Sequence, residues 1–293
     1  MKYWSSNNIS SGTISAIISA LLFGVCVPFA KLLEQNIPCA ALGGFLYLGA
    51  GVGLFITILF KKNKKGLNLT IKELPYIAGM VILDISAIVL LMFGILYTTG
   101  SNASLLGNLE LAATSLIACL LFKEKISKKL WFSIFIIITA CMILSFEGKN
   151  SIVFNYGSIL VILSAIFWGL ENNFTKKLSI KDTRQITVIK GVFSGVGGLV
   201  IAHIIRETMP EIKYIFLALL LGFISYGVSV SLYIYAQRYI GAAKTATYFA
   251  LAPFFGVLFS LFILKEIPNI QFYIALLLML TGTILVIRDS KNS

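Results

Sequence analysis

The chain of 293 residues is 58% apolar and only 12% charged, with a mean hydropathy of +0.93. Soluble domains carry about one quarter charged residues, so this composition excludes an ordinary soluble fold and predicts a protein embedded in lipid. The net charge of +12 does not indicate nucleic-acid binding, because the aromatic side chains lie within the apolar stretches.

Ten apolar stretches follow one another along the chain, each close to the roughly 20 residues that a membrane-spanning helix needs. Irregular backbone cannot face lipid, so each stretch is expected to be a helix. The first stretch is long for a signal peptide, contains Lys31 and lacks a small-residue cleavage site, so we expect it to be retained. The predicted spans are residues 13–33, 41–60, 74–97, 101–122, 129–146, 156–176, 184–205, 214–236, 242–264 and 270–287.

Most of the 24 Lys and Arg residues fall on one side of the membrane when the N-terminus is placed in the cytoplasm. This bias predicts cytoplasmic location of both termini and an even number of spans. We expect a multi-pass protein of the plasma (inner) membrane, whose basic loops contact anionic lipids of the bilayer.

Few residues are available for metal or covalent chemistry. The cysteines Cys26, Cys39, Cys119 and Cys141 form no C-x-x-C pair, and His203 is the only histidine, which excludes an H-E-x-x-H site. There is no Walker A sequence and no G-x-S-x-G elbow. The sequence therefore predicts no catalytic residue, no metal and no cofactor, and disfavours an enzyme.

The chain repeats itself at about half its length, with offsets of 145 near the start and 141 to 142 further on. The matching positions are Ser19-Ala20 with Ser164-Ala165, Phe23-Gly24 with Trp168-Gly169, Gly100 with Gly241, and Lys123-Glu124 with Lys265-Glu266. The alternative is that apolar helices resemble one another by composition. Two units, residues 13–146 and 156–287, would each hold five spans, and an odd number makes the second unit inverted relative to the first.

Several of these segments resemble the EamA family of the drug/metabolite transporter superfamily. The resemblance rests on residues 167–177, on Leu109-Glu110, on residues 241–245 and on Ala252-Pro253. It implies ten spans in two inverted five-helix repeats, a central cavity and carriage of small metabolites, but no particular substrate. Many members have Glu-Pro where this chain has Glu110-Leu111, so the local kink of those members is not expected here.

Ionisable residues inside a span cost about 2.5–3.5 kcal/mol and need a partner, a cavity or a function. Glu110 either titrates during transport or clamps two helices together. Glu171, with Asn172, Asn173 and the indole of Trp168, has the groups to bind an ammonium ion, or forms an interhelical clamp.

Two further charges and one polar stripe complete the candidate site. Asp84 either pairs with Lys190 or faces a cavity, and Lys190 alone either snorkels to the cytoplasmic surface or meets a substrate carboxylate. Tyr226 and Tyr233 belong to a stripe with Ser229 and Gln237, which indicates either a cavity wall or a helix interface.

Small residues and prolines predict how the helices pack and bend. The Gly49-x-x-x-Gly53 and Gly191-x-x-x-Gly195 patterns predict close helix contacts, with a gating hinge as the secondary interpretation. Pro28 and Pro253 lie inside predicted spans and are expected to kink them.

The sequence favours a secondary active transporter of small polar metabolites, with amino acids as one candidate class and export as the favoured direction. It would work by alternating access, with Glu110 and Glu171 as candidate proton sites. The alternatives are a flippase for lipids or lipid-linked sugars on the same scaffold, an integral-membrane enzyme and a passive channel. A single chain supplies both halves of such a carrier, so a monomer is sufficient.

Overall fold

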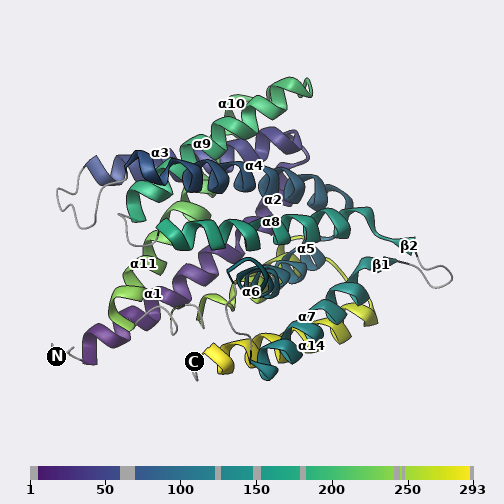
Figure 1. The fold of residues 1–293 in the computed structure, drawn as a ribbon. Coiled ribbons are helices and arrows are strands. Elements are labelled where there is room, and N and C mark those ends of the chain that lie inside the picture. The colour runs from purple at the N-terminus through teal and green to yellow at the C-terminus, as the bar shows by residue number, and fades with distance from the viewer. Residues whose placement is uncertain are drawn as a thin grey trace.

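The computed structural model describes residues 6–59, 70–122, 127–147, 153–178, 183–240, 245 and 248–290. Figure 1 shows an elongated bundle of helices with one short β-hairpin at one end. The N-terminal half contains α1 (Ser6–Gly24), α2 (Cys26–Leu33), α3 (Cys39–Leu59), the 3₁₀ turn η1 (Ile71–Glu73), α4 (Leu74–Tyr97), α5 (Gly100–Leu106), α6 (Leu109–Phe122) and α7 (Lys128–Ser145).

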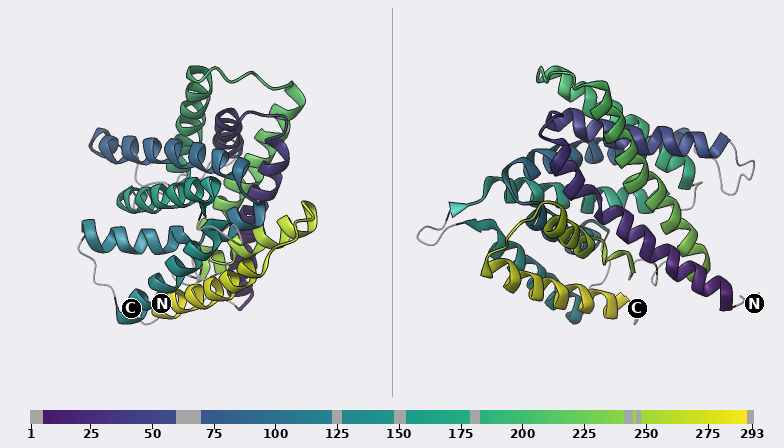
Figure 2. Two further views of the ribbon diagram at one scale, coloured as in Figure 1. Left: turned by 90° about the vertical axis from the view of Figure 1, so that its right-hand side faces the viewer. Right: turned by 180° about the vertical axis from the view of Figure 1, so that it is seen from behind.

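The hairpin of β1 (Phe146–Glu147) and β2 (Val153–Phe154) joins the two halves, with Phe146 opposite Phe154 in an antiparallel register. The second half contains α8 (Tyr156–Leu178), α9 (Thr183–Ile204), α10 (Ile212–Gly222), the π-helix η2 (Phe223–Val228), α11 (Ser229–Ile240), α13 (Ala252–Ile263) and α14 (Ile270–Ser290). The start of α1 and the end of α14 both lie away from the hairpin (Figure 1, Figure 2).

Seven helical stretches of the described chain are long and apolar enough to cross a membrane. This agrees with the prediction of a helical membrane protein that crosses the bilayer several times. Seven of the ten predicted spans meet the length and hydropathy expected of a membrane-spanning helix. They are Ser10–Leu33, Cys39–Thr57, Ile71–Tyr97, Gly100–Leu120, Tyr156–Thr175, Gln185–Ile204 and Ile212–Tyr233.

The three other predicted spans, 129–146, 242–264 and 270–287, are represented by α7, α13 and α14. The apolar stretches of α13 and α14, Ala252–Ile263 and Ile270–Leu285, are shorter than the first seven. Residues 241–244 and 246–247, at the start of the ninth predicted span, lie outside the described residues.

Pro28 and Pro253 each follow an interruption of the helical chain. The first helix is interrupted at Val25, three residues before Pro28, because Pro28 has no N–H to donate to the carbonyl of Gly24. Pro253 also follows an interruption, because residues 248–249 are helical, residues 250–251 form a turn and Pro253 lies in the first turn of α13. Proline is well suited to a first turn, where its missing N–H costs nothing, and it therefore begins this helix.

Glycines allow α3 to pack closely against both α9 and the α10–η2 segment. A Cβ atom on Gly191 would lie 2.5 Å from the backbone nitrogen of Gly51, and one on Gly195 would lie 2.6 Å from that of Leu48. A Cβ atom on Gly49 would collide with the carbonyl of Leu219. These contacts confirm the packing interpretation of both glycine patterns.

Most of the buried apolar side chains form one large core that runs between the helices, with α4 and α8 in extensive contact and α7 lying against α14. A second, small cluster contains Met80, Leu178 and Ile186. Figure 1 shows α8 in the middle of the bundle, with α3 and α4 on one side and α7 and α14 on the other. From this central position, α8 contacts polar side chains of several other helices, including α6 and α9.

One end of the bundle carries the β-hairpin and the loops 34–38, 98–99, 205–211 and 264–269, and we call it the hairpin end (Figure 2). Two carboxylates from distant loops cap helix starts here. Glu207 accepts the N–H groups of Ala40 and Ala41 at 3.0 and 2.8 Å. Glu266 accepts those of Gly100 and Ser101 at 2.6 and 2.8 Å. Both caps satisfy backbone donors that a helix leaves unpaired.

Candidate functional site

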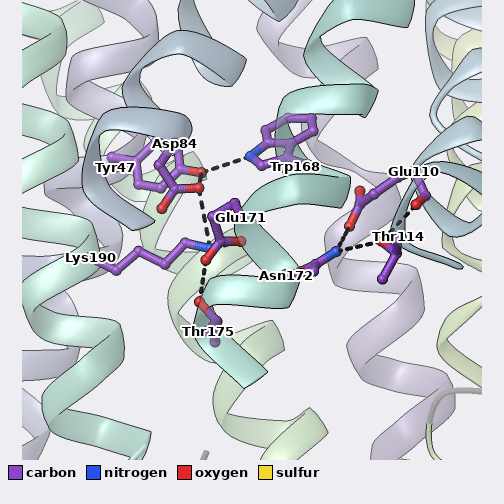
Figure 3. A network of polar contacts seen from close by, with 9 residues as sticks. All are labelled: Tyr47, Asp84, Glu110, Thr114, Trp168, Glu171, Asn172, Thr175 and Lys190. Atoms are coloured by element: carbon purple, nitrogen blue, oxygen red, sulfur yellow. Dashed lines mark hydrogen bonds and ion pairs between the residues drawn. The ribbon is translucent and has the colours of Figure 1, made fainter. Parts of the chain in front are cut away.

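A lysine and two carboxylates meet in the interior of the bundle. Lys190 on α9 places its Nζ atom 3.2 Å from Asp84 Oδ1 on α4 and 3.0 Å from Glu171 Oε2 on α8 (Figure 3). The side chains of Asp84 and Glu171 are 0% and 1% exposed, whereas that of Lys190 is 26% exposed. The Asp84–Lys190 pair considered from the sequence is therefore present, and Glu171 joins it.

Aromatic and hydroxyl groups complete this cluster. The Tyr47 hydroxyl donates to Asp84 Oδ1 at 3.0 Å, and the indole N–H of Trp168 donates to the Tyr47 oxygen at 3.2 Å. The hydroxyl of Thr175 donates to Glu171 Oε1. We use the term ionic cluster for Asp84, Glu171 and Lys190 with these three neighbours.

One oxygen of the ionic cluster has no partner. Asp84 Oδ2 is buried without a hydrogen bond in the part of the chain that the structure describes. A buried unpaired carboxylate oxygen is costly, so this position favours the approach of a further donor.

Glu110 belongs to a separate group of contacts. Its Oε1 atom accepts the side-chain amide of Asn172 at 2.7 Å, and the same amide lies 3.3 Å from Thr114 Oγ1. Figure 3 shows this group and the ionic cluster on different sides of α8. Glu110 thus has the interhelical contact expected for a clamp between α6 and α8.

The amide of Asn173 points to backbone carbonyls, at 3.1 Å from Thr114 O and 2.9 Å from Gly169 O. Glu171, Asn172 and Asn173 therefore do not converge on one point. Consecutive residues of an α-helix are turned by about 100° from each other, which is why the three neighbours face different partners.

The predicted polar stripe of the eighth span divides into parts. Tyr226 is 9% exposed and stacks on Tyr47 with 5.3 Å between ring centroids, beside the ionic cluster. Ser229 bonds to the backbone and hydroxyl of Ser19, as expected for a helix interface. Tyr233 packs on Phe249 at 5.0 Å, and the side chain of Gln237 lies outside those that the structure describes.

Sequence reasoning missed Tyr47, Thr114 and the π-helix. Tyr47 stands in an apolar run, and the only signal was that a buried tyrosine hydroxyl needs a partner. The π-helix Phe223–Val228 contains Tyr226. A π-turn shifts the side chains that follow it, and such turns occur frequently at functional sites.

No three His, Cys, Asp or Glu side chains within the described ranges lie close enough to hold a metal ion. The charges of the interior are instead paired with one another or with amide and hydroxyl groups. Buried charges in membrane-spanning helices mark functional sites such as substrate or ion pathways. The fold is that of a multi-pass helical membrane protein with such charges in its interior.

A family model described as the EamA-like transporter family matches residues 10–146 and again residues 155–288. The chain belongs to the EamA-like transporter family, as its sequence resemblance predicted. The family points to a transporter rather than an enzyme.

Two relatives carry the name "Uncharacterized transporter". One, from Methanothermobacter thermautotrophicus, is 31% identical over 300 residues, covering 96% of this chain and 87% of the relative. The other, from Clostridium kluyveri, is 22% identical over 298 residues, covering 97% and 96%. One solved crystal structure superposes with a TM-score of 0.66 at 12% identity, covering 94% of this chain and 96% of its own, which shows a shared fold.

Proposed function

We propose that this protein is a secondary active transporter that carries small polar metabolites through an interior site by alternating access. The observation that carries the proposal is the buried ionic cluster. Asp84 lies in the first matched segment, whereas Glu171 and Lys190 lie in the second. The ion pairs therefore join the two segments that would move relative to each other in such a carrier.

Recurring contacts support the proposal of two related five-helix units, residues 13–146 and 156–287. Ser19 Oγ donates to the carbonyl of Ser229 at 2.7 Å. Ser164 Oγ, 145 positions later, donates at 2.7 Å to the carbonyl of Ala87, which is 142 positions before Ser229. Each contact joins the two units, and the offsets are those of the sequence repeat.

Two glycine contacts recur in the same way. A Cβ atom on Gly24 would lie 2.8 Å from Phe255 Cβ, and one on Gly169 would lie 2.7 Å from Ala113 Cβ. Gly24 and Gly169 are 145 positions apart, and Ala113 and Phe255 are 142 apart. Such reciprocal contacts are those expected of units related by a two-fold axis in the membrane plane.

The proposal extends to ten spans, cytoplasmic termini, the plasma (inner) membrane and a functional monomer. The hairpin end would then face outward. The proposed direction is export, the substrate class includes amino acids, and the candidate proton sites are Glu110 and Glu171. Glu110 has an amide rather than a cation as its partner, which leaves its proton free to exchange without breaking an ion pair.

Comparative metabolomics of cells and medium tests this function. Cells expressing the wild type are compared with cells expressing Glu171→Gln at equal membrane abundance. We expect one class of soluble metabolite to shift between cell and medium only with the wild type, since the variant removes one charge of the ionic cluster. Equal shifts with both proteins would contradict the role of Glu171. No soluble shift with either would contradict a metabolite carrier and favour the flippase.

A further inference from the structure

We infer that the ammonium group of Lys190 occupies the position of a substrate ammonium, and that the substrate is an organic ammonium compound with an apolar body. This inference rests on the proposed function and names the substrate class of the same site. Loading would move Lys190 away from Asp84 and Glu171, and release of the substrate would let it return.

The distances describe two acceptors for an ammonium group. An ammonium has three donors, and Lys190 Nζ lies within 3.2 Å of one carboxylate and 3.0 Å of the other. Each carboxylate also accepts a hydrogen bond from a hydroxyl group, Asp84 from Tyr47 and Glu171 from Thr175. They therefore keep their positions when the lysine leaves, and a ligand ammonium finds the same acceptors.

The lysine is the movable member of the cluster. Its side chain is 26% exposed, whereas the carboxylates are 0% and 1% exposed. It sits on α9 seven residues after the helix begins at Thr183, and its flexible four-carbon stem can carry the charge toward that helix end.

The other oxygen of the aspartate, Asp84 Oδ2, provides a further acceptor. It is buried and accepts no hydrogen bond in the described structure, although Asp84 Oδ1 accepts two donors. Lys190 thus leaves part of the carboxylate unsatisfied. A ligand with a primary ammonium and a less constrained position satisfies both oxygens.

Aromatic rings continue from the ionic cluster and provide the apolar part of the subsite. Tyr226 stacks on Tyr47, Phe23 lies 5.5 Å from Tyr226, and Phe249 lies 5.2 Å from Phe23. Aromatic faces attract cations and pack well against apolar groups. The run favours a ligand whose ammonium meets the carboxylates and whose body lies on the rings.

The proposed repeat relates the charged residues of the site to uncharged ones. At the offsets of 145 and 142, the positions that correspond to Glu171 and Asp84 are Cys26 and Tyr226. A ligand lying across both sets of positions needs one charged and one uncharged part.

A substrate anion is less compatible with this geometry. To pair with Lys190 it would approach two buried carboxylates that already surround the ammonium. Like charges at such distances repel strongly in a medium of low dielectric constant. The site therefore selects a cationic group.

Ligand binding to the purified full-length protein tests the inference. With Trp4→Phe and Trp131→Phe in the background, fluorescence reports Trp168 alone. The probes are 2-phenylethylammonium and, as the matched anion, 3-phenylpropionate. We expect Lys190→Met to bind the ammonium probe about tenfold more tightly, if the lysine fills the subsite in about nine of ten unliganded molecules. We expect no gain for the anion.

The controls separate this role from a structural one. Lys213→Met, which removes a lysine that is 64% exposed, should leave both affinities unchanged. Asp84→Asn combined with Lys190→Met should abolish the gain. Lys190→Gln replaces Lys190→Met if the latter does not fold. Weaker binding of the ammonium probe by either neutral variant, or tighter binding of the anion, would overturn the inference.

Counterflow in proteoliposomes distinguishes this inference from the proposed function. Movement of a soluble metabolite without any binding of the ammonium probe would overturn the inference and leave the transporter standing. Competition between the transported metabolite and 2-phenylethylammonium would support both. Tight ammonium binding without movement of any solute would support the subsite and overturn the carrier.

Discussion

Single acidic residues of this chain are stabilised in different ways. Asp84 has a lysine and a tyrosine, and Glu110 has a side-chain amide. Glu34, next to the end of α2, has Lys31 at 3.1 Å from Oε1, while its Oε2 is buried and accepts no hydrogen bond in the described residues. Lys31 also donates to the carbonyl of Ile95. The cost of burying the Glu34 carboxylate is therefore only partly offset by its ion pair with Lys31.

Glu34 makes the stability of the hairpin end depend on pH. Burial raises the pKa of Glu34 above its ordinary value of 4.5, although Lys31 opposes this. The folded protein thus holds this proton more tightly than the unfolded chain. The stability gained from the neutral form is complete below the unfolded pKa and is lost as pH rises through the higher folded pKa.

Glu34→Gln is neutral at every pH. We expect its melting temperature to rise relative to the wild type between about pH 4 and pH 7, because the wild type alone loses stability over this range. Thermal unfolding in detergent measures the difference. Glu211→Gln, at a side chain that is 71% exposed, is the matched control. A difference that stays constant or falls with pH would contradict the argument.

The sequence indicated the charged residues of the site but not their arrangement. Asp84, Glu110, Glu171 and Lys190 stand out because each is ionisable inside an apolar run. Which of them meet depends on how each helix is rotated and how closely the helices pack, and one sequence does not contain these quantities. Tyr47 could not be identified for the same reason.

Helix contacts at glycine set the next level of organisation. Gly222, at the end of α10, lies against the carbonyl of Leu46 on α3, and a Cβ atom there would collide with it. A backbone carbonyl cannot change rotamer as a side chain can, so the added methyl group would push the two helices apart. We expect Gly222→Ala to lower the free energy of unfolding by about 3 kcal/mol, at the upper end of ordinary overpacking.

Denaturant titration of the reconstituted protein measures this loss. Gly107→Ala is the control, since the nearest atoms to its added Cβ are carbonyls of its own turn, at 3.1 and 3.8 Å, and its backbone is in the ordinary helical region. Equal effects of the two substitutions would show that the α3–α10 approach is not a constraint.

Helix α5 depends on a carboxylate from a remote loop. Glu266 accepts the N–H groups of Gly100 and Ser101, and Thr99 accepts that of Asn102. We expect Glu266→Ala to cost about 1–2 kcal/mol of stability, as losing an N-cap acceptor does. Glu211→Ala should have no measurable effect, because Glu211 at the start of α10 makes no side-chain cap. A silent Glu266→Ala would contradict the capping role.

Apolar runs predicted most of the helices at this scale, because lipid requires every backbone group to be paired within a helix. The run 214–236 gave no sign that Phe223–Val228 forms a π-helix, which arises from tertiary contacts rather than composition. The interruption before Pro253 was predicted, because a proline inside an apolar run removes a backbone donor from the helix.

The whole molecule is expected to respond alike at equivalent positions of its two halves. Ser19 and Ser164 are both fully buried and each donates to a carbonyl of the other half at 2.7 Å. We expect Ser19→Ala and Ser164→Ala each to lower stability by about 1 kcal/mol. The double variant should show the sum, since the two contacts share no partner.

Thr281→Ala is the control for this pair, because its exposed hydroxyl donates within its own helix, to the carbonyl of Leu277. Urea titration in detergent measures all four proteins. A large loss at one serine and none at the other would contradict the equivalence of the two halves.

The sequence repeats at offsets of 145 and 142 predict which positions correspond, and this correspondence stays a prediction. The pattern did not indicate the number of helices long enough to cross a membrane, because hydropathy does not locate helix ends. Gly241 and Lys123-Glu124, which also carried the repeat, lie outside the described residues.

The carboxylate caps at the hairpin end also affect hydrogen–deuterium exchange. The first amides of a helix normally exchange quickly because no carbonyl accepts them. Here Ala40, Ala41, Gly100 and Ser101 are held by Glu207 and Glu266. Deuterium can replace the hydrogen of these four amides only when their hydrogen bonds to Glu207 and Glu266 break. Their exchange rates therefore report how often this end of the protein opens, without any label or ligand.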